Sequence, residues 1–499
     1  MPLPAEPWPG AVAGRILTHA GGGRTAVCDG ARTWTFDELA LRAERVAHRL
    51  GGTAGLGGTH VALLATPDAD WVASLLGIWL AGGVAVPLSP QYPGRELAWF
   101  CDDAAVQTAI VSPEYRALAD ELRPGRLLCE PAALSAVGVP ARAATEPEPG
   151  AVAVLVYTSG TTGKPKGALL THGGLAVQTR VLAQHWGVVD DDRLLHALPL
   201  HHVHGLVVAL LTALAAGASV QLLPRFDVAA VVAGLADATV WMAVPTMYQK
   251  LRAATAAPVA NAVARLRLAT SGSAALPVAT AAWWESLTGA IPLERYGMTE
   301  TGIVLSNPLE IGERRAGLVG APLPTFDVRL VPDAGADAVS GPGELEVRGP
   351  SLFAGYWRRP GATAAAYASG GWFRTGDRAV RSPDGAFRLL GRTSVDVIKS
   401  GGYKLSAVEI EDVLRQHPAI DDVAVVGVPD EIWGESVVAA VVAAQPLDPE
   451  AVRVWARDHL AAYQVPKVVV QMADLPRNPL GKCVKPALLA LLARRRQAP

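Results

Sequence analysis

The hydrophobic pattern of the chain consists of apolar runs of strand length that alternate with helical stretches. Clear examples are the runs at 151–158, 218–223 and 239–244, and an Ala-rich helical stretch lies around 210–216. The runs are continuously apolar instead of alternating with polar residues, as expected where helices cover both faces of a sheet. The pattern therefore predicts an α/β fold with largely parallel sheets.

Two long segments without Asp, Glu, Lys or Arg could be mistaken for membrane-spanning helices. They lie at 71–94 and 194–224. The first is interrupted by Gly82 and the second by Pro199 and Gly217. Because glycine and proline interrupt helices, each segment predicts a buried helix, a turn and a buried strand, and no membrane partner is expected.

The character of the chain changes after Arg392. A compact block of elements is predicted there: a helix at 407–416, strands at 423–428 and 436–443, a helix at about 449–462 and a basic tail. Such a block is large enough for a small α+β domain. We therefore expect an N-terminal domain over residues 1–394 and a C-terminal domain over residues 395–499.

The composition favours a globular protein that acts on small molecules. Half of the 499 residues are hydrophobic, and 44 basic residues nearly balance 46 acidic ones, for a net charge of −2. This balance provides no long-range field that would attract nucleic acid. The four cysteines have no metal-ligand spacing and the N-terminus has no signal-peptide pattern, so we expect a cytoplasmic protein with reduced thiols.

A loop rich in Gly, Ser and Thr follows the apolar run at 151–158. Its glycines permit close backbone approach, and its hydroxyls, N–H groups and lysines suit phosphate oxygens. It is not a Walker A loop, because Lys164 is followed by Pro165 instead of Ser or Thr. The candidate nucleotide-binding residues of this loop are Thr158, Ser159, Gly160, Thr161, Thr162, Gly163, Lys164 and Lys166.

The same loop carries a family resemblance. YTSGTTGKPKG at 157–167 is similar to the signature of the adenylate-forming superfamily, which contains acyl-CoA synthetases, luciferases and the adenylation domains of peptide synthetases. Further motifs appear in the family's order: SGSAALP at 271–277, ERYGMTE at 294–300, GELEVRGPSLFAGYW at 343–357, WFRTGD at 372–377, GRTSVDVIKSGGYKLSAVEIE at 391–411 and PRNPLGK at 476–482. The resemblance implies a mobile C-terminal domain and the use of ATP, Mg²⁺ and coenzyme A.

The resemblance also assigns roles within the ERYGMTE motif. Tyr296 matches the aromatic residue that stacks on adenine, and Thr299 matches the hydroxyl that contacts the α-phosphate. Glu300 matches the carboxylate that coordinates Mg²⁺, and Thr162 is expected to join it at the metal. One or two carboxylates beside phosphate and water are the usual protein ligands of this ion.

Three further residues complete the implied nucleotide site. Asp377 matches the acid that accepts both ribose hydroxyls, as an ionised carboxylate can, and Arg392 lies beside it. Lys482 matches the lysine that bridges carboxylate and phosphate during adenylation. Two anions about 4 Å apart repel by about 4 kcal/mol at an effective dielectric constant of 20, which one positioned lysine can offset.

The remaining contacts to nucleotide and CoA are also implied by the motifs. Ser273 and Ala274 form a wall of the nucleotide and acyl pocket, and the loop at 400–403 forms a wall of the CoA tunnel. The remaining residues predicted to bind the nucleotide or CoA are Glu294, Arg295, Gly297, Lys399, Ser400, Gly401 and Gly402. Asp396 falls one residue later than in the usual family pattern, so the hinge is expected in this region without one assigned residue.

The His-rich turn at 200–205 allows two interpretations. A metal site would need further Cys, His or acidic ligands at suitable spacing, and none is evident. The turn resembles the family's Pro-Leu-Phe-His stretch, in which His202 is the histidine beside the acyl pocket. We therefore expect His202 to contact substrate and to act at the catalytic centre.

Arg295 is the residue that indicates the substrate. A guanidinium at this position, together with Ser273, can bind a second carboxylate of the substrate in bidentate fashion. The alternative is a structural ion pair with Glu294 or another acid. The surrounding motifs look most like malonyl-CoA and methylmalonyl-CoA synthetases, and Val203 and Met298 are the candidate pocket walls.

The sequence thus predicts a ligase that joins malonate or methylmalonate to CoA through an acyl-adenylate, with AMP and pyrophosphate as products. Two other enzymes remain open: a free-standing loader of a carrier protein, and a CoA synthetase for another short-chain acid. An adenylate-binding module without turnover is a further alternative. The oligomeric state is not predicted.

Overall fold

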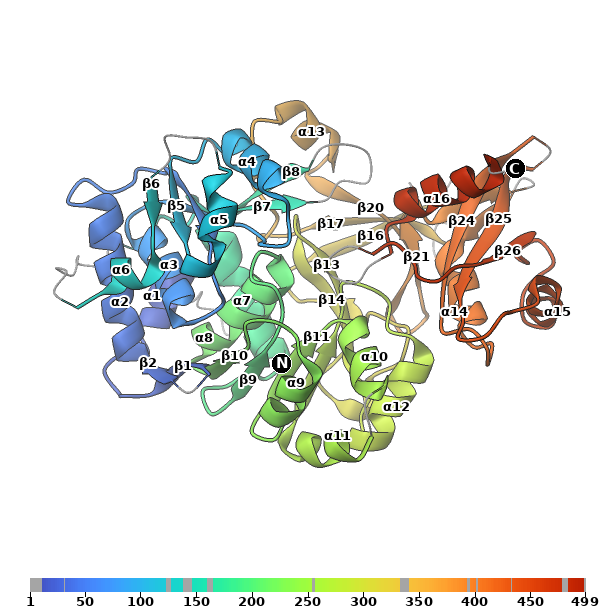
Figure 1. Cartoon of the computed structure of the whole chain (residues 1–499), viewed down its shortest axis with the longest axis horizontal. Helices are drawn as coiled ribbons and strands as arrows, with labels where there is room; N and C mark the ends of the chain where they lie inside the picture. The colour runs from blue at the N-terminus through green and yellow to red at the C-terminus, as the bar shows by residue number, and fades with distance from the viewer. Residues whose placement is uncertain are drawn as a thin grey trace.

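The structure is a computed structural model that describes residues 11–30, 32–122, 127–137, 146–158, 165–253, 256–332, 341–392, 395–400, 403–431, 433–477 and 483–497. Figure 1 shows a large N-terminal body and a smaller C-terminal unit beside it. The predicted α/β class is confirmed.

The largest sheet of the N-terminal body runs in the order β15-β14-β13-β12-β11-β9-β10-β1-β2. Its central strands pair in parallel, whereas β2, β14 and β15 are antiparallel additions at the edges. The strands span β1 Thr25–Asp29, β2 Arg32–Thr35, β9 Arg193–His196, β10 Ser219–Leu222, β11 Val240–Ala243, β12 Leu268–Ser271, β13 Leu293–Met298, β14 Gly302–Ser306 and β15 Ala321–Pro322.

A second sheet runs in the order β18-β8-β7-β4-β3-β5-β6. Strands β3 to β7 pair in parallel, β8 pairs antiparallel with β7, and β18 pairs antiparallel with β8. The strands span β3 His60–Leu64, β4 Val84–Pro87, β5 Thr108–Val111, β6 Leu127–Cys129, β7 Val152–Thr158, β8 Lys166–Thr171 and β18 Gly355–Tyr356.

Helices fill the space around these two sheets. One continuous apolar core includes residues of both sheets and of the helices between them. The helices are α1 Val12–Leu17, α2 Phe36–Gly51, α3 Ala69–Leu80, α4 Gly94–Asp103, η1 Pro113–Tyr115, α5 Arg116–Asp120, α6 Pro131–Ser135, α7 His172–His185, η2 His204–Leu211, α8 Thr212–Ala216, α9 Val228–Leu235, α10 Pro245–Ala253, α11 Ala256–Ala262, η3 Val263–Arg265 and α12 Val278–Thr288.

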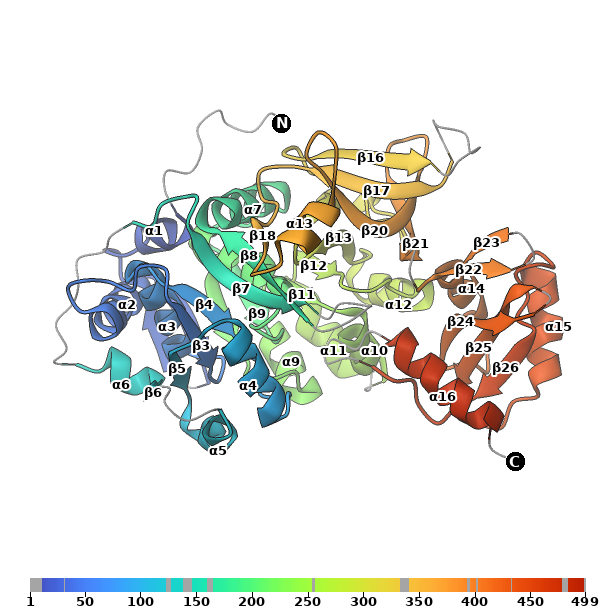
Figure 2. The same ribbon diagram turned by 90° about the horizontal axis from the view of Figure 1, so that it is seen from above.

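A smaller antiparallel sheet follows along the chain and completes the N-terminal body. Its elements are η4 Ile311–Glu313, β16 Asp327–Pro332, β17 Gly343–Arg348, α13 Pro360–Ala365, β19 Tyr367–Ala368, β20 Trp372–Arg381 and β21 Phe387–Arg392. Strand β21 leads from this sheet towards the C-terminal unit (Figures 1 and 2).

The C-terminal unit is a five-stranded sheet with helices on both faces (Figure 2). Its elements are β22 Val397–Ser400, β23 Tyr403–Ser406, α14 Ala407–Leu414, β24 Asp422–Asp430, β25 Gly434–Val442, α15 Pro449–His459, β26 Val468–Gln471 and α16 Lys485–Gln497. Helices α14 and α15 pack on one apolar cluster and α16 on a second, across the sheet. The predicted small α+β unit is therefore present.

Both long uncharged segments have the predicted form. The first is α3 followed by a turn and β4, and the second contains η2, α8 and β10. Within the described ranges, no helix has both the length and the apolar character that crossing a bilayer requires. The predicted boundary between residues 394 and 395 adjoins residues outside the described ranges and stays a prediction.

Candidate active site

The centre of the site lies at the carboxyl ends of two neighbouring parallel strands, β12 and β13. Ser271 of β12 pairs with Glu294 of β13, so the residues that follow both lie at the same edge of the sheet. The Arg295 side chain crosses Gly272, where a Cβ atom would lie 2.3 Å from the Arg295 Nη1 atom. The glycine of the SGS motif is therefore required for the guanidinium to lie against the backbone.

Arg295 is a buried cation with two guanidinium nitrogens that have no described hydrogen-bond partner. Its exposed fraction is 4%, and no described residue offers a hydrogen-bond partner to its Nε or Nη2 atoms. Burial lowers the pKa of Arg295 to about 9, and Tyr248 opposes the shift. An unpartnered buried charge is costly, so this arrangement indicates a place for an anion.

His204 and Ser273 lie beside this guanidinium. A hydrogen bond of 3.2 Å joins His204 Nδ1 to Ser273 Oγ. Burial, followed by the positive charge of Arg295, holds the pKa of His204 well below its ordinary value, which keeps the ring neutral. Ser273 has a φ of 69°, in the left-handed region that non-glycine residues occupy mainly at turns and functional sites.

The His-rich turn forms the start of an eight-residue π-helix, η2, at His204. Such helices are rare and are often found at functional sites. The family resemblance points to His202, whereas the only signal for His204 in the sequence is its place two residues later. Burial lowers the pKa of His202 to about 4, and no described residue pairs with its Nε2 atom.

Glu294 does not pair with Arg295. Successive side chains of a strand point to opposite faces, and the Glu294 carboxylate accepts a hydrogen bond of 2.7 Å from the Gly317 N–H. Burial raises the pKa of Glu294 to about 7. The structural ion pair between these two residues, considered above as an alternative, is therefore not what the structure contains.

The turn between β13 and β14 presents Thr299 and Glu300. A Cβ atom on Gly297 would lie 2.0 Å from the Gly302 carbonyl oxygen, so the hairpin closes only with glycine there. The Thr301 Oγ1 atom accepts a hydrogen bond of 3.1 Å from the Met298 N–H and fixes the turn.

Glu300 is buried and is held by a tyrosine, Tyr356, that was not among the predicted site residues. The Tyr356 hydroxyl of β18 donates a hydrogen bond of 2.8 Å to Glu300 Oε1. The Lys166 ammonium lies 4.3 Å from the centre of the Tyr356 ring. Tyr356 thus joins two predicted site residues that are far apart in sequence.

The two strands that flank the Gly-rich loop pair with each other where the loop begins and ends. Thr158 of β7 pairs with Lys166 of β8, and the Thr158 hydroxyl donates to the Lys166 carbonyl at 3.3 Å. The predicted phosphate-binding residues Ser159, Gly160, Thr161, Thr162, Gly163 and Lys164 lie outside the described residues.

Asp377 of β20 is fixed by two donors. The Tyr296 hydroxyl donates to its Oδ2 atom at 2.5 Å, and Arg392 Nε donates to its Oδ1 atom at 3.1 Å. The structure thus brings together Tyr296, predicted to stack on adenine, Asp377, predicted to bind the ribose, and Arg392, predicted to lie beside Asp377. A carboxylate that has accepted two hydrogen bonds retains lone pairs for ribose hydroxyls.

The other predicted residues lie in the N-terminal body, in the C-terminal unit or outside the described residues. Val203 and Thr299 line one small cavity. Met298 is the last residue of β13, and Ala274 follows Ser273 after the end of β12. Lys399 and Ser400 lie on β22 of the C-terminal unit, and no contact in the described part of the chain joins them to the nucleotide residues. Gly401, Gly402 and Lys482 lie outside the described residues.

Within the described ranges, no group of three or more His, Cys, Asp and Glu side chains is arranged to hold a metal. The buried Glu300 carboxylate, oriented by Tyr356, fits a Mg²⁺ ion bound mainly by substrate phosphates and water, which uses only one or two protein carboxylates. A magnesium ion that arrives with ATP is therefore compatible with this site.

Comparison with known proteins identifies the family. A family model described as AMP-binding enzyme matches residues 18–357, and the model of its C-terminal domain matches residues 409–482. The chain belongs to the AMP-binding enzyme family. The predicted resemblance to adenylate-forming enzymes is thereby confirmed.

Relatives of this AMP-binding enzyme include malonate–CoA ligases. The mitochondrial malonate–CoA ligase of Bos taurus is 39% identical over 96% of this chain and 90% of its own. The Homo sapiens protein of the same name is 40% identical over 94% of this chain and 90% of its own.

Two solved structures match this AMP-binding enzyme over nearly its full length. ATP-bound MatB from Rhodopseudomonas palustris is 33% identical with a TM-score of 0.90, covering 96% of this chain and 98% of its own. A malonyl-CoA ligase in a ternary product complex with methylmalonyl-CoA and AMP is 41% identical with a TM-score of 0.67, covering 92% and 98% respectively.

Proposed function

We propose that this protein is an ATP- and Mg²⁺-dependent ligase that joins malonate or methylmalonate to coenzyme A through an acyl-adenylate. The observation that carries the proposal is the buried Arg295, whose guanidinium has no described partner at Nε or Nη2. A second carboxylate of the substrate would neutralise it and could form bidentate hydrogen bonds. Relatives named as malonate–CoA ligases support the same substrate.

In the first half-reaction, a carboxylate oxygen of the acid attacks the α-phosphorus of ATP. The new C–O–P linkage forms as the bond to pyrophosphate breaks. Mg²⁺, when bound, neutralises phosphate charge. The chain contributes the Asp377 carboxylate for ribose, Thr299 near the α-phosphate, Glu300 for the metal and Lys482 between the two reacting anions.

In the second half-reaction, the CoA thiol, after losing its proton, attacks the acyl carbon and AMP leaves. We assign the β22 side of the C-terminal unit, with Lys399 and Ser400, to this step. The chain superposes better on ATP-bound MatB than on the product complex, which is more similar in sequence. The difference in TM-score supports the proposal that residues 395–499 occupy different positions in the two half-reactions. The described arrangement is then the one that catalyses adenylation.

The site also predicts an asymmetric selectivity. An acid without a second carboxylate leaves Arg295 buried without its anion, which a polar site penalises strongly. One methyl branch changes the free energy by only about 1–3 kcal/mol, so methylmalonate is accepted together with malonate. We further propose a cytoplasmic location; the animal relatives are named as mitochondrial, so cell fractionation decides this point.

The test is Arg295→Ala, assayed for AMP formation with malonate, methylmalonate and butyrate in the presence of CoA. We expect kcat/KM for malonate to fall by about 10³-fold or more, with butyrate favoured relative to malonate. Unchanged kcat/KM for malonate would contradict the assignment.

A matched control is Arg314→Ala. Arg314 is also a buried arginine, but its guanidinium donates to the carbonyl oxygens of Pro308, Leu309 and Ile291. Its removal should lower stability without changing the ratio of malonate to butyrate turnover. A changed ratio in this variant would show that selectivity depends on general packing and not on Arg295.

A further inference from the structure

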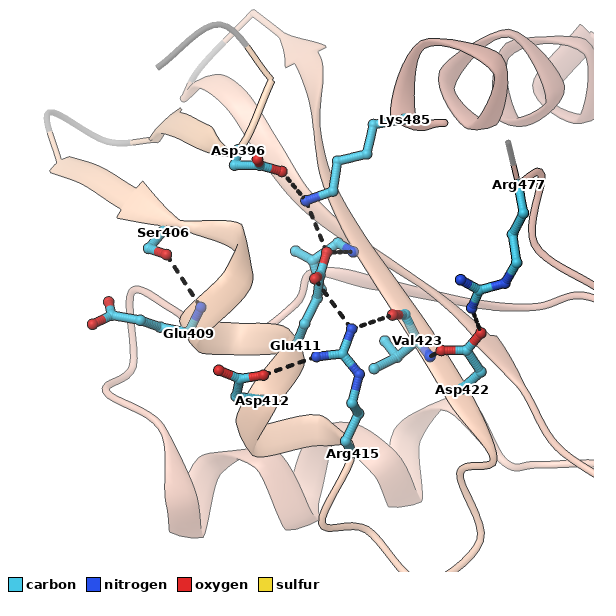
Figure 3. Close-up of polar contacts among 11 residues, drawn as sticks. Asp396, Ser406, Glu409, Glu411, Asp412, Arg415, Asp422, Val423, Arg477 and Lys485 are labelled. Atoms are coloured by element: carbon cyan, nitrogen blue, oxygen red, sulfur yellow. Dashed lines mark hydrogen bonds and ion pairs between the residues drawn. The ribbon is translucent and has the colours of Figure 1, made fainter. Parts of the chain in front are cut away.

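Lys485 is a buried lysine at the first residue of α16. Its Nζ atom lies 2.5 Å from Asp396 Oδ1 and 2.8 Å from Glu411 Oε1 (Figure 3). All three side chains are at most 9% exposed. The cluster therefore joins α16, helix α14 and the segment immediately before β22.

Further contacts hold the Glu411 carboxylate of this cluster in place. Glu411 Oε1 also accepts a hydrogen bond of 2.8 Å from the Val425 N–H of β24, and Arg415 contacts Glu411 Oε2 at 3.3 Å. Burial alone would lower the pKa of Lys485, but Glu411 and Asp396 raise it above its ordinary value. Lys485 is therefore charged and its position is fixed by two carboxylates.

Packing alone does not require a charged residue at this position. Leu488 and Leu492 of α16 already anchor the helix in the apolar cluster beneath it. Buried ion pairs are often no more stabilising than apolar residues of similar volume, and a common use of them is to fix one geometry. Lys485 is therefore better explained as a residue that fixes the position of its neighbours than as a residue that only stabilises the fold.

One partner of Lys485 connects directly to the nucleotide residues. Asp396 Oδ2 accepts a hydrogen bond of 2.9 Å from the Arg392 N–H, and the Arg392 side chain donates to Asp377. Gly391 lies so close that a Cβ atom there would be 2.4 Å from the Asp396 Cβ. A continuous series of contacts thus runs from Lys485 to Asp377.

The other side of Lys485 adjoins the segment that carries Lys482. Residues Arg477 and Cys483 form an antiparallel bridge on either side of that segment, and the Val484 N–H donates to the Pro476 carbonyl at 2.8 Å. Arg477 in turn contacts Asp422 of β24 (Figure 3). Both flanks of 478–482 are therefore attached to the C-terminal sheet, and Lys485 attaches the second flank to Asp396.

We propose that Lys485 is a positioning residue for adenylation, whose ion pairs with Asp396 and Glu411 set the position of Lys482 relative to the nucleotide. This inference rests on the proposed function, in which Lys482 acts on ATP and the acid. Lys485 itself contacts neither. Its effect is confined to the half-reaction in which Lys482 works.

The test compares the two half-reactions in Lys485→Met. Adenylation is measured as malonate-dependent exchange of pyrophosphate into ATP, and thioester formation is measured from preformed malonyl-AMP and CoA. We expect adenylation to fall by about 10²-fold, the cost of a displacement of about 1 Å at a reacting group, with thioester formation retained. Lys485→Arg, which keeps the charge, should restore part of the adenylation rate.

The matched control is Lys467→Met in the same unit. The Lys467 ammonium lies over the Trp433 ring at 3.3 Å and has no described contact with the Lys485 cluster. This variant should leave both half-reactions unchanged. If it reproduces the loss seen in Lys485→Met, the proposal is wrong.

A second variant guards against misfolding of Lys485→Met. Asp396→Asn keeps the Lys485–Glu411 pair and should also lose adenylation selectively. Equal loss of both half-reactions, or normal adenylation, in this variant would overturn the proposal. Failure of the proposed function is recognised separately, because wild-type protein would then not turn over malonate, or Lys482→Ala would retain pyrophosphate exchange.

Discussion

Glu294 is a buried acid that couples folding to pH. Its pKa is raised from 4.5 to about 7, with burial as the main cause. The folded state therefore retains a proton that the unfolded state releases between these two values. The stability that this proton provides is complete below about pH 4.5 and is lost as pH rises through about 7.

We therefore expect Glu294→Gln to remove a pH dependence of stability. Between pH 4.5 and 8, the wild-type free energy of unfolding should fall by up to about 3 kcal/mol relative to the variant, since one pKa unit corresponds to about 1.4 kcal/mol. Urea unfolding at a series of pH values measures the difference. Glu285→Gln, at an exposed glutamate of α12, is the control, and the same pH profile in both variants would contradict the expectation.

The hydrogen bond from Tyr356 to Glu300 predicts that Tyr356 affects the Mg²⁺ dependence of AMP formation. Its hydroxyl orients the Glu300 carboxylate, and loss of a residue that orients a metal ligand typically weakens metal affinity by about 10- to 100-fold. Tyr356→Phe retains the ring beneath Lys166 and removes only the hydrogen bond. We expect a higher Mg²⁺ concentration for half-maximal AMP formation and a largely restored rate at saturating Mg²⁺; an unchanged Mg²⁺ titration would show that Tyr356 does not act through Glu300.

At the scale of elements, the β13–β14 hairpin is the most sensitive part of the site. The Gly297 Cα lies against the Gly302 carbonyl, and an added methyl group would overlap it at 2.0 Å. Gly297→Ala should separate the strands and displace Thr299 and Glu300, with a loss of adenylation of about 10²-fold. Gly312→Ala is the control, because a Cβ there meets nothing within 4 Å; equal activity of both variants would refute the prediction.

The sequence predicted the elements better than their contacts. Continuous apolar runs located β7, β10 and β11 to within a residue or two, because buried parallel strands require such runs. Helices α14 and α15 end at Leu414 and His459, two to three residues earlier than predicted, as helix termini are weakly specified by sequence. The π-helix η2 was predicted only as a buried helix, since its apolar residues have no period.

The sequence predicted those candidate site residues that lie within recognisable motifs. The motif ERYGMTE supplied Tyr296, Glu300 and Arg295, but Tyr356 and His204 act through contacts 56 and 69 positions away in sequence. Such pairings depend on the register of distant strands, which local pattern does not specify. The glycine of the SGS motif indicates that something lies close to the backbone at Gly272. The sequence does not indicate that the Arg295 side chain is what lies there.

At the scale of the whole molecule, the apolar cores of the C-terminal unit are separate from the core of the N-terminal body. A chain that ends after Arg392 should therefore fold and retain the Tyr296–Asp377–Arg392 contacts. We expect it to bind ATP with affinity within about tenfold of the full chain, because only the contacts of the removed unit are lost, and to form no adenylate. Circular dichroism reports whether the fragment folds, and calorimetric titration measures its affinity for ATP. A fragment that is unfolded, or that does not bind ATP, would contradict the prediction.

The buried guanidinium of Arg295 makes the protein sensitive to the anions of the solution in which it is handled. We expect a buried cation beside the proposed substrate site to attract small anions such as chloride, formate or sulfate before any substrate binds. Such ions would occupy the place proposed for the second carboxylate and would have to leave when malonate binds. The apparent affinity for the diacid should therefore depend on the identity of the buffer anion, and not only on ionic strength, whereas butyrate should be insensitive to the exchange.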